Sequence, residues 1–558
     1  MSTPIAPDEL ERLLRSTTPH ALLDVRERAT YERGHIYRAT SLPRRLLELR
    51  LPALVSAGTT PIVLCDDGGA KPQHDAQPQA ERVRGESMRD RLSALAAPTL
   101  AAMGYRDVRV LQDGLAGWRA SGRRVVQGLN VPSKVFGERV RHELKTPEVL
   151  PHELAGRIAR GDDMVIVDSR TPEEYRRGCI PGAISVPGAE LAYRITELVD
   201  RPDTTIVVHC GGRTRSYLGA ESLRRVGLPN PIVALKNGTM GWQLADLELE
   251  RGADRLWPAA SEKSRTVAAS VAERVAAEDR IPFATPDEVT ALIARRDVDN
   301  VAVLDVRTAD EYAEAHVAGA TWAPGGQAVQ ATDEYVAVRA ATIVLVCDGS
   351  VRSVLTAAWL RRMGLPNVRV LRGGLPAWVS AGGAVERGHP ASEVFGLTQA
   401  RAKVRTVTAA ELRAMLERDF APVVVDVDPS DAYTRAHVPA ATWVARTRLE
   451  DLIGGVAPDR TRPVVVTCSD GVMSTLTAAT LAPLGYAASV LDGGKRAWEA
   501  SGGATEQGLT RAADAPDDVV LKPYERGRWA MEAYLRWEEA LDQEGWSPHA
   551  LLEPPART

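Results

Sequence analysis

The chain contains the same kind of segment four times, and this repeat constrains its fold more than any other feature of the sequence. Each copy has an apolar run ending in an aspartate, a tyrosine seven residues later, and a second apolar run ending in a cysteine. The cysteine follows the aspartate by 41 residues in the first copy (24 to 65) and by 42 in the others. The aspartates and cysteines are Asp24, Asp168, Asp305 and Asp426, and Cys65, Cys210, Cys347 and Cys468. The repeat predicts four copies of one structural unit.

The linkers indicate that a pair of units was itself duplicated. PSKVFGE follows the first unit and ASEVFGL the third, and their phenylalanines, Phe136 and Phe395, are 259 residues apart. Cys210 and Cys468 are 258 residues apart, which matches that shift. We expect units at residues 1–128, 143–254, 282–388 and 405–508, a linker helix within 255–281, and a helical C-terminal extension at 509–558.

The pattern within one unit predicts an α/β fold. Runs such as VIVD and TIVVHC are short, continuous and rich in β-branched residues, which is typical of parallel strands buried on both faces. Between them, Thr171 precedes two glutamates and begins a helix, and RSYLGAESLRRVGL after Cys210 has helical spacing. Alternating strands and helices predict a central, mostly parallel sheet flanked by helices in each unit.

Composition excludes several classes of protein. Lys+Arg number 69 and Asp+Glu 73, a net charge of −4, so no basic excess suggests nucleic acid or an anionic membrane as partner. No apolar run approaches the roughly 18 residues of a membrane span. The N-terminus lacks the features of a signal peptide, and we expect a cytoplasmic protein. The five cysteines form no CxxC, so no metal site and no cofactor is implied; homo-oligomerisation is left open.

The position of each repeat cysteine suggests its chemistry. It lies between a strand and the following helix, where backbone N–H groups and the helix N-terminus favour an anion on sulfur. The second unit continues Cys210-Gly-Gly-Arg-Thr-Arg215-Ser, and the third continues Cys347-Asp-Gly-Ser-Val-Arg352-Ser. An arginine five residues after the cysteine can clamp an oxyanion. This pattern favours nucleophilic catalysis by a thiolate on a small anionic substrate.

These residues resemble the rhodanese family over about 430 of the 558 residues. The matching features are the Asp-x-Arg strand end, the downstream tyrosine, the Cys-x4-Arg loop and the closing Gly-x3-Trp. The resemblance implies four tandem rhodanese-like domains. It also implies a sulfurtransferase that moves a sulfane sulfur from thiosulfate or a similar donor, through a cysteine persulfide, to cyanide or another thiophilic acceptor.

The resemblance ranks the cysteines Cys210, Cys347, Cys468 and Cys65. It makes Arg215 and Arg352 donor-binding residues, with Arg213 as an additional cation. Met473 replaces the loop arginine in the fourth unit, and the Cys-to-Gly spacing of the first unit is 22 residues longer than the 17 of the others, so both units are expected to be degenerate.

Several other residues have structural interpretations. Asp168 and Asp305 are expected to orient the loop by bonding its amides or pairing with arginine. The closing tryptophans (Trp118, Trp242, Trp378 and Trp498) are expected in the core. Cys179 replaces the histidine of the other units and lies in a turn, which favours a structural role. Tyr534, Trp537 and Leu541 share one face of a C-terminal helix and are expected to pack on the body or on a second subunit.

Two alternative functions remain. One is a non-enzymatic persulfide carrier or scaffold, which suits the degenerate units. The other is a cysteine-based phosphatase, since His209-Cys210 resembles the start of a His-Cys-x5-Arg loop; here the arginine comes one residue too early. The enzymatic interpretation requires that the sulfurs of Cys210 and Cys347 face the loop amides and are not entombed.

Overall fold

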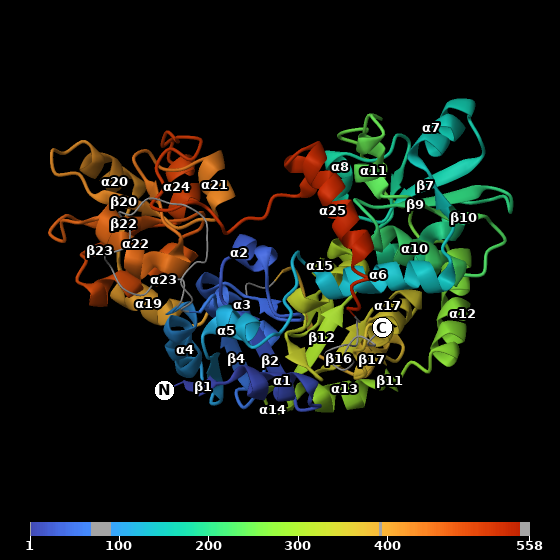
Figure 1. The fold of residues 1–558 in the computed structure, drawn as a ribbon, viewed down its shortest axis with the longest axis horizontal. Helices are drawn as coiled ribbons and strands as arrows, with labels where there is room; N and C mark the ends of the chain where they lie inside the picture. The colour runs from blue at the N-terminus through green and yellow to red at the C-terminus, as the bar shows by residue number, and fades with distance from the viewer. Residues whose placement is uncertain (1, 69–90, 390–392, 547–558) are drawn as a thin grey trace.

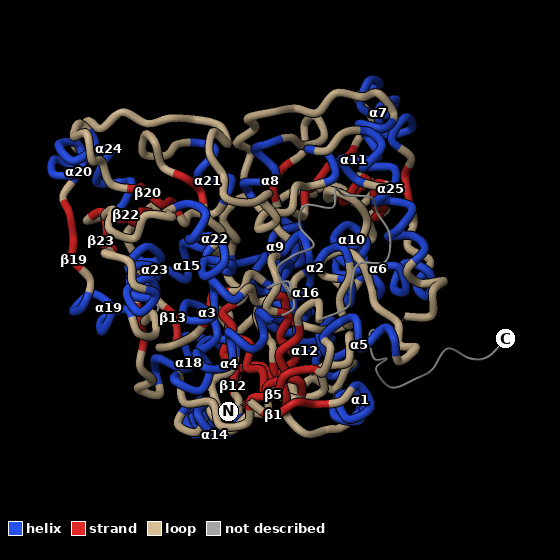
Figure 2. Tube along the Cα trace, turned by 60° about the vertical axis from the view of Figure 1, so that its left-hand side comes forward, coloured by secondary structure: helices blue, strands red, loops and turns tan. Residues whose placement is uncertain are grey.

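The computed structural model describes residues 2–68, 91–389 and 393–546. Each sequence unit builds one sheet, and we call the units domains 1 to 4. Domains 1 and 3 lie next to each other, with domain 4 and domain 2 on opposite sides of them (Figure 1). Helices surround each sheet (Figure 2). The predicted α/β architecture with four mostly parallel sheets is therefore confirmed.

Domain 2 shows the common topology. Its strand order is β6-β10-β9-β7-β8, and all neighbouring strands are parallel. The central strand β9 is buried along its whole length, as its unbroken apolar run predicts. The strands are β6 (Glu148–Val149), β7 (Met164–Asp168), β8 (Ile184–Ser185), β9 (Thr205–His209) and β10 (Ile232–Leu235). The helices are α7 (Pro151–Arg160), α8 (Pro172–Arg177), α9 (Gly188–Arg194), α10 (Thr214–Arg224) and α11 (Gly238–Leu244).

The other domains repeat this order with local differences. Domain 1 has β1 (Thr3–Ile5), α1 (Pro7–Arg15), β2 (His20–Asp24), α2 (Arg28–Arg33), β3 (Thr40–Ser41), α3 (Leu47–Leu54), β4 (Ile62–Cys65), α4 (Leu92–Ala102), β5 (Val108–Leu111) and α5 (Gly114–Ala120). Domain 3 has β11 (Phe283–Ala284), α13 (Pro286–Ile293), α14 (Arg296–Asp299), β12 (Val301–Asp305), α15 (Ala309–Glu314), β13 (His316–Val317), β14 (Thr321–Trp322), α16 (Gly325–Gln330), β15 (Val338–Arg339), β16 (Thr342–Val346), α17 (Val351–Arg362), β17 (Val368–Leu371), α18 (Gly374–Ser380) and β18 (Val385–Glu386). Domain 4 has β19 (Arg405–Val407), α20 (Ala409–Leu416), β20 (Val423–Asp426), α21 (Ser430–Arg435), β21 (Thr442–Trp443), α22 (Leu449–Val456), β22 (Val464–Thr467), α23 (Val472–Leu481), β23 (Ala488–Leu491) and α24 (Gly494–Ala500).

Domains 2 and 3 share one hydrophobic core. It joins buried side chains of α9 and α10 to those of α16 and α17, and the expected linker helix, α12 (Glu262–Glu278), closes it. Domain 3 also adds a strand to the sheet of domain 1, because β15 pairs antiparallel with β2, next to the short strand β3 on the same side of β2. The repeat pattern within a unit does not predict either connection.

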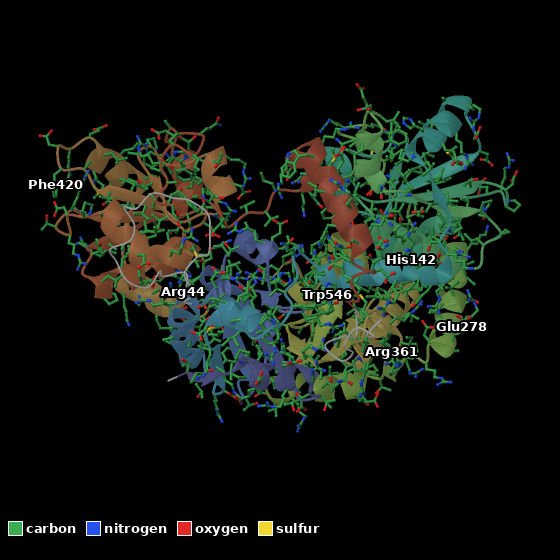
Figure 3. The ribbon with its side chains drawn as sticks, in the orientation of Figure 1. Arg44, His142, Glu278, Arg361, Phe420 and Trp546 are labelled. Carbon is green, nitrogen blue, oxygen red and sulfur yellow. The ribbon has the colours of Figure 1, made fainter. Side chains whose placement is uncertain are left out.

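Domains 1 and 4 meet through matching ion pairs. Arg44 bonds Glu450 at 2.5 and 2.8 Å, and Arg446 bonds Glu48 at 2.6 and 3.1 Å. Arg44 lies on the blue domain where it meets the orange one (Figure 3). The four residues come from corresponding positions of the two units, so the contact is approximately two-fold symmetric.

Two helices outside the repeats pack on domain 2. The first linker forms α6 (Val131–Leu144), which lies along α10. The C-terminal segment leaves domain 4 and crosses to domain 2 (red in Figure 1), where α25 (Arg528–Ala540) packs against α6 and α11. The three residues of the predicted face pack on the body of the protein: Leu541 and Trp537 join a cluster with domain 1 and α6, and Tyr534 joins one with Met240 of domain 2. No helix in the described ranges is long and apolar enough to cross a membrane.

Candidate active site

The four repeat cysteines end, or directly follow, the strand that is third in the spatial order of each sheet (β4, β9, β16 and β22), and the closing motif holds the next residues in place. In domain 2, Thr239 N donates to Cys210 O at 2.8 Å, and Leu375 and Lys495 make the same bond to Cys347 and Cys468. The glycine before each donor has a positive φ. At Gly238, with φ 53°, a Cβ atom would lie 2.2 Å from Cys210 O. Glycine is therefore required where the closing motif touches the loop.

In domain 2, the sulfur of Cys210 lies at the N-terminal end of α10. Its Sγ is 3.4 Å from Ser216 Oγ, which donates to Arg213 O at 2.8 Å. Cys210 is 2% exposed. The loop from Cys210 to Ser216 contains no acidic residue, so the positive end of the helix is not offset from within the loop.

Arg215 is held by a glutamate that the sequence analysis did not single out. Its Nη1 and Nη2 donate to Glu174 at 2.6 and 2.9 Å. Burial opposes ionisation of Glu174, but Arg215 lowers the pKa of this carboxyl well below its usual value. Burial acts against the Arg215 charge, whereas Glu174 and then Cys210 raise the pKa of the guanidinium. Arg215 therefore lies within the electrostatic influence of the sulfur, in an orientation that Glu174 sets.

The sequence contained a signal for Glu174. Domain 3 has Glu311 and Arg352 at the same two positions, whereas domain 4 has Ala432 and Met473. The glutamate and the arginine are thus present together or absent together. A pair that changes together in this way is a contact within the unit.

Arg213 does not lie at the mouth of the loop. It is 1% exposed, and its Nε and Nη2 donate to Glu138 of α6 at 2.5 and 2.7 Å, while Nη1 donates to Asn237. The role expected for Arg213, binding a donor anion, is not supported by this position, because its guanidinium fastens the linker helix to the loop.

In domain 3, the sulfur is entombed. Cys347 is 0% exposed, and its Sγ lies 2.9 Å from Ser353 Oγ. Burial, together with the carboxylate of Asp348, raises the pKa of the thiol to about 11. The structure thus gives Cys347 no exposed surface in this conformation, and its role as a nucleophile stays a prediction.

In domain 3, three carboxylates surround the loop arginine. Arg352 is 0% exposed; it bonds Glu311 at 2.7 and 2.8 Å and Glu190 at 2.9 Å, and it lies 3.2 Å from Asp348. Its guanidinium also lies 4.4 Å from the ring centre of Tyr193. Glu190 and Tyr193 belong to α9 of domain 2. No pattern inside unit 3 could reveal them. Together with Glu311 and Asp348 they engage both Nη atoms of Arg352, and only its buried Nε is left without a partner among the described residues.

In domain 4, a different charge arrangement surrounds the cysteine. Ser474 N and Oγ lie 3.3 and 3.4 Å from Cys468 Sγ, so the sulfur faces the loop, but burial raises the pKa of its thiol. Asp428 accepts from Ser469 N at 2.8 Å and from Lys495 Nζ at 3.0 Å. The site thus has a carboxylate where domain 2 has Arg170.

In domain 1, acidic groups surround the cysteine. Cys65 is 1% exposed, and burial, with the Asp24 carboxylate, raises the pKa of its thiol well above the usual value. The two residues that follow, Asp66 and Asp67, are acidic; Asp67 accepts from Arg26 Nη1 at 2.6 Å. The long insertion falls largely outside the described residues.

The strand-end aspartates pair with arginine. Asp168 accepts from the backbone N, Nε and Nη2 of Arg170, and Arg170 Nη2 also donates to Gly178 O. Asp305 and Arg307 repeat the arrangement. Two arrangements are expected for these aspartates, bonds to the loop amides or a pair with arginine. The structure shows the pair with arginine. Within residues 2–68, 91–389 and 393–546, no cluster of three or more His, Cys, Asp or Glu side chains could hold a metal ion.

Comparison with known proteins gives a consistent result. The family model of the Rhodanese-like domain matches residues 6–121, 150–245, 285–381 and 408–501. A crystal structure of a thiosulfate sulfurtransferase from Pseudomonas aeruginosa is 35% identical, covers 97% of each chain and superposes with a TM-score of 0.87.

Curated relatives match smaller parts of the chain. A protein of Mycobacterium tuberculosis that carries a thiosulfate sulfurtransferase name is 29% identical over 254 residues, 36% of this chain and 88% of its own length. A sulfurtransferase of Allochromatium vinosum is 30% identical over 95 residues, 17% of this chain and 86% of its own length. Together, the matching domains and the names of the relatives support sulfurtransferase activity.

Proposed function

The chain belongs to the rhodanese family, and from this premise we propose that it is a thiosulfate sulfurtransferase whose active site lies in domain 2, with Cys210 as the nucleophile. Sulfurtransferase activity is the general function that the domains and relatives support. Thiosulfate as donor, the persulfide on Cys210 and the division of labour among the domains are the content of the proposal.

The observation that carries the proposal is the charge of the loop that follows each of the four cysteines. The loop of Cys210 holds two arginines and no acidic residue, whereas acidic residues follow each other repeat cysteine within two positions. Asp348 lies beside Cys347, Asp470 Oδ1 is 3.7 Å from Cys468 Sγ, and Asp66 follows Cys65. A thiolate and an anionic donor are both disfavoured next to a carboxylate. Domain 2 thus offers the best environment for both.

The first half-reaction would load the sulfur. The Cys210 thiolate attacks the outer sulfur of thiosulfate, the sulfur–sulfur bond of the donor breaks, and sulfite leaves with the electron pair of that bond. The product is a persulfide anion on Cys210. The N-terminus of α10 and the Arg215 guanidinium, oriented by Glu174, stabilise the negative charge on the sulfurs.

The second half-reaction would unload it. Cyanide or another thiophilic acceptor attacks the terminal sulfur, and the Cys210 thiolate leaves with the bonding electrons; with cyanide the product is thiocyanate. No external oxidant or reductant is needed, because each step breaks one bond to the transferred sulfur as it forms another. The two separate displacements predict ping-pong kinetics.

Domains 1, 3 and 4 are proposed to act as a scaffold. Burial raises the pKa of their three cysteine thiols, and domain 3 contributes to the shared core against which α9 and α10 of domain 2 pack. The scaffold interpretation from the sequence thus applies to these three domains, together with an active domain 2.

The test uses single Cys→Ser variants of the full chain at positions 65, 210, 347 and 468. We expect Cys210→Ser to lower sulfite release from thiosulfate by at least about a thousandfold, because the covalent path is lost. The other three variants should stay within about threefold of the wild type. Mass spectrometry after thiosulfate treatment should find one added sulfur on Cys210.

Two results would contradict the proposal. One is an unmodified Cys210 in the wild type after thiosulfate treatment, together with a Cys210→Ser variant that still releases sulfite. The other is hydrolysis of an aryl phosphate at Cys210 without any thiocyanate formation, which would favour the phosphatase.

A further inference from the structure

The two arginines of the Cys210 loop are each engaged by a glutamate, so a further cation near this loop would add to the binding of an anionic donor. Arg213 is bound to Glu138, and Arg215 to Glu174, each through two bonds. A lysine from outside the repeat, Lys134 of α6, lies close to the same loop. It belongs to PSKVFGE, the linker motif that marks the duplication.

Helix α6 touches the loop along one face. A Cβ atom on Gly137 would lie 2.9 Å from Thr214 Cγ2, and Thr214 is the first residue of α10. Glu138, one residue further, bonds Arg213. Lys134 precedes Gly137 by three residues and Glu138 by four, so all three share this face of the helix. The face that carries Lys134 is the one that meets the Cys210 loop.

Helix α25 covers the other side of the loop. A Cβ atom on Gly212 would lie 3.1 Å from Glu538 Oε2 and 3.5 Å from Tyr534 Cε1. Thr214 Oγ1 donates to Glu538 Oε1 at 2.8 Å. Lys134 Nζ lies 5.4 Å from the ring centre of Tyr534 and 5.9 Å from that of Trp537. Lys134 is therefore enclosed between α6, the aromatic side chains of α25 and the loop.

The ammonium group has no hydrogen-bond acceptor among the described residues, although Lys134 is only 5% exposed. Glu538, Asp333 and Glu32 act on it from beyond ion-pair distance. Burial, and then the neighbouring cations Lys522 and Arg215, lower the pKa of Lys134 despite these carboxylates. The ammonium nitrogen is not among the fully buried atoms, so it keeps some contact with solvent and an anion can reach it. Partial burial without a hydrogen-bond partner is costly for a cation, and a bound anion lowers that cost.

We propose that Lys134 binds the anionic sulfonate end of the sulfur donor, beneath Tyr534 and Trp537, while the outer sulfur reaches Cys210. This inference rests on the proposed function of domain 2 and names the residue that selects its donor. Glu538, whose Oε2 is buried and unpartnered, lies against the same loop and opposes a dianion. Lys134 and Glu538 thus act on donor affinity with opposite signs.

The second copy of the linker supports this assignment. In ASEVFGL, Glu393 stands in place of Lys134 and Leu397 in place of Glu138, and Glu393 is exposed. Domain 4 is also the domain that has Met473 in place of the loop arginine. Domain 4 therefore lacks both the linker lysine and the loop arginine.

Steady-state kinetics of the full chain test the proposal. Lys134→Met keeps the aliphatic stem and removes the charge; it should lower kcat/KM for thiosulfate about tenfold, as expected for one charge-assisted hydrogen bond. Because the mechanism is ping-pong, kcat/KM for a neutral thiol acceptor should not change. Glu538→Gln keeps an acceptor for Thr214 and should raise kcat/KM for thiosulfate about threefold. A purely structural role would not give shifts of opposite sign confined to the donor.

Two matched controls use exposed residues. Lys263→Met on α12 and Glu532→Gln on α25 should leave both kcat/KM values unchanged. Calorimetric titration of thiosulfate into Cys210→Ser, with and without Lys134→Met, separates this inference from the proposed function, because binding needs no sulfur transfer. An unchanged dissociation constant in the double variant would overturn the role of Lys134. Binding that depends on Lys134, without any persulfide in the wild type, would instead overturn the proposed function.

Discussion

At the scale of residues, one ion pair distinguishes the two domains that keep a loop arginine from the two that do not. Glu174 and Arg215 join the helix after β7 to the loop after β9, and their side chains are 21% and 17% exposed. Thr171 caps α8 as predicted, since its Oγ1 accepts from Glu174 N. The cap and the ion pair both act through Glu174, so a local helix signal also places the partner of the loop arginine.

Removing this carboxylate should destabilise domain 2 in a pH-dependent way. Arg215 lowers the pKa of Glu174 in the folded protein, so the stabilisation is present above the unfolded pKa of about 4.3 and is lost as the pH falls through the folded value. We expect Glu174→Gln to lower the free energy of unfolding by about 2 kcal/mol at pH 7 and by much less near pH 3. Urea denaturation at both pH values measures this.

The neighbouring Glu173→Gln is the control for this prediction, because Glu173 is exposed and forms no ion pair among the described contacts. It should change stability by less than about 0.5 kcal/mol. An equal loss for Glu174→Gln at both pH values would show that packing, and not the charge, is responsible.

At the scale of elements, the closing Gly-x3-Trp motif has two separate functions. The four tryptophans are 2–4% exposed, and each indole Nε1 donates to a carbonyl six residues later, so the core interpretation is confirmed. The glycine lets the backbone approach the carbonyl of Cys210. The motif therefore anchors the turn that carries Cys210 to the sheet.

A methyl group at Gly238 should disrupt the site. Its Cβ atom would lie 2.2 Å from Cys210 O, and the φ of 53° adds backbone strain. We expect Gly238→Ala to lower the free energy of unfolding by more than about 2 kcal/mol and to reduce sulfite release at least about tenfold. The control is Gly252→Ala, where φ is also positive, at 72°, but no atom lies within 4 Å. Equal effects of the two variants would assign the loss to φ alone.

At the scale of the whole molecule, only some of the domain contacts follow the order of the chain. Domain 2 shares its core with domain 3, the next domain, whereas domain 1 pairs its strand β2 with β15 of domain 3 and forms its two-fold ion pairs with domain 4. The C-terminal segment then returns from domain 4 to domain 2 (Figure 1). The Cys210 site is consequently completed by α6, which follows domain 1, and by α25, which follows domain 4.

A charge exchange tests the contact of domains 1 and 4. We expect Arg44→Glu to weaken the interface by about 1–2 kcal/mol, because it places a carboxylate opposite Glu450. Glu450→Arg in the same chain should restore it. Hydrogen exchange of α3 and α22, followed by mass spectrometry, reports the opening. No rescue by the double variant would mean that the ion pair does not contribute.

The sequence by itself determined the four units, their parallel sheets, the position of each cysteine at a strand end and the core tryptophans. These features depend on periodicity and on contacts within one unit, which a repeat displays four times. The tertiary structure decided that Cys347 is fully buried and that the ammonium group of Lys134 has no hydrogen-bond acceptor among the described residues. Arg352 meets Glu190 of another domain, and Lys134 meets Tyr534 from the far end of the chain. Such contacts join residues more than 150 positions apart, and no local pattern encodes them, because burial and electrostatics depend on what packs against a side chain.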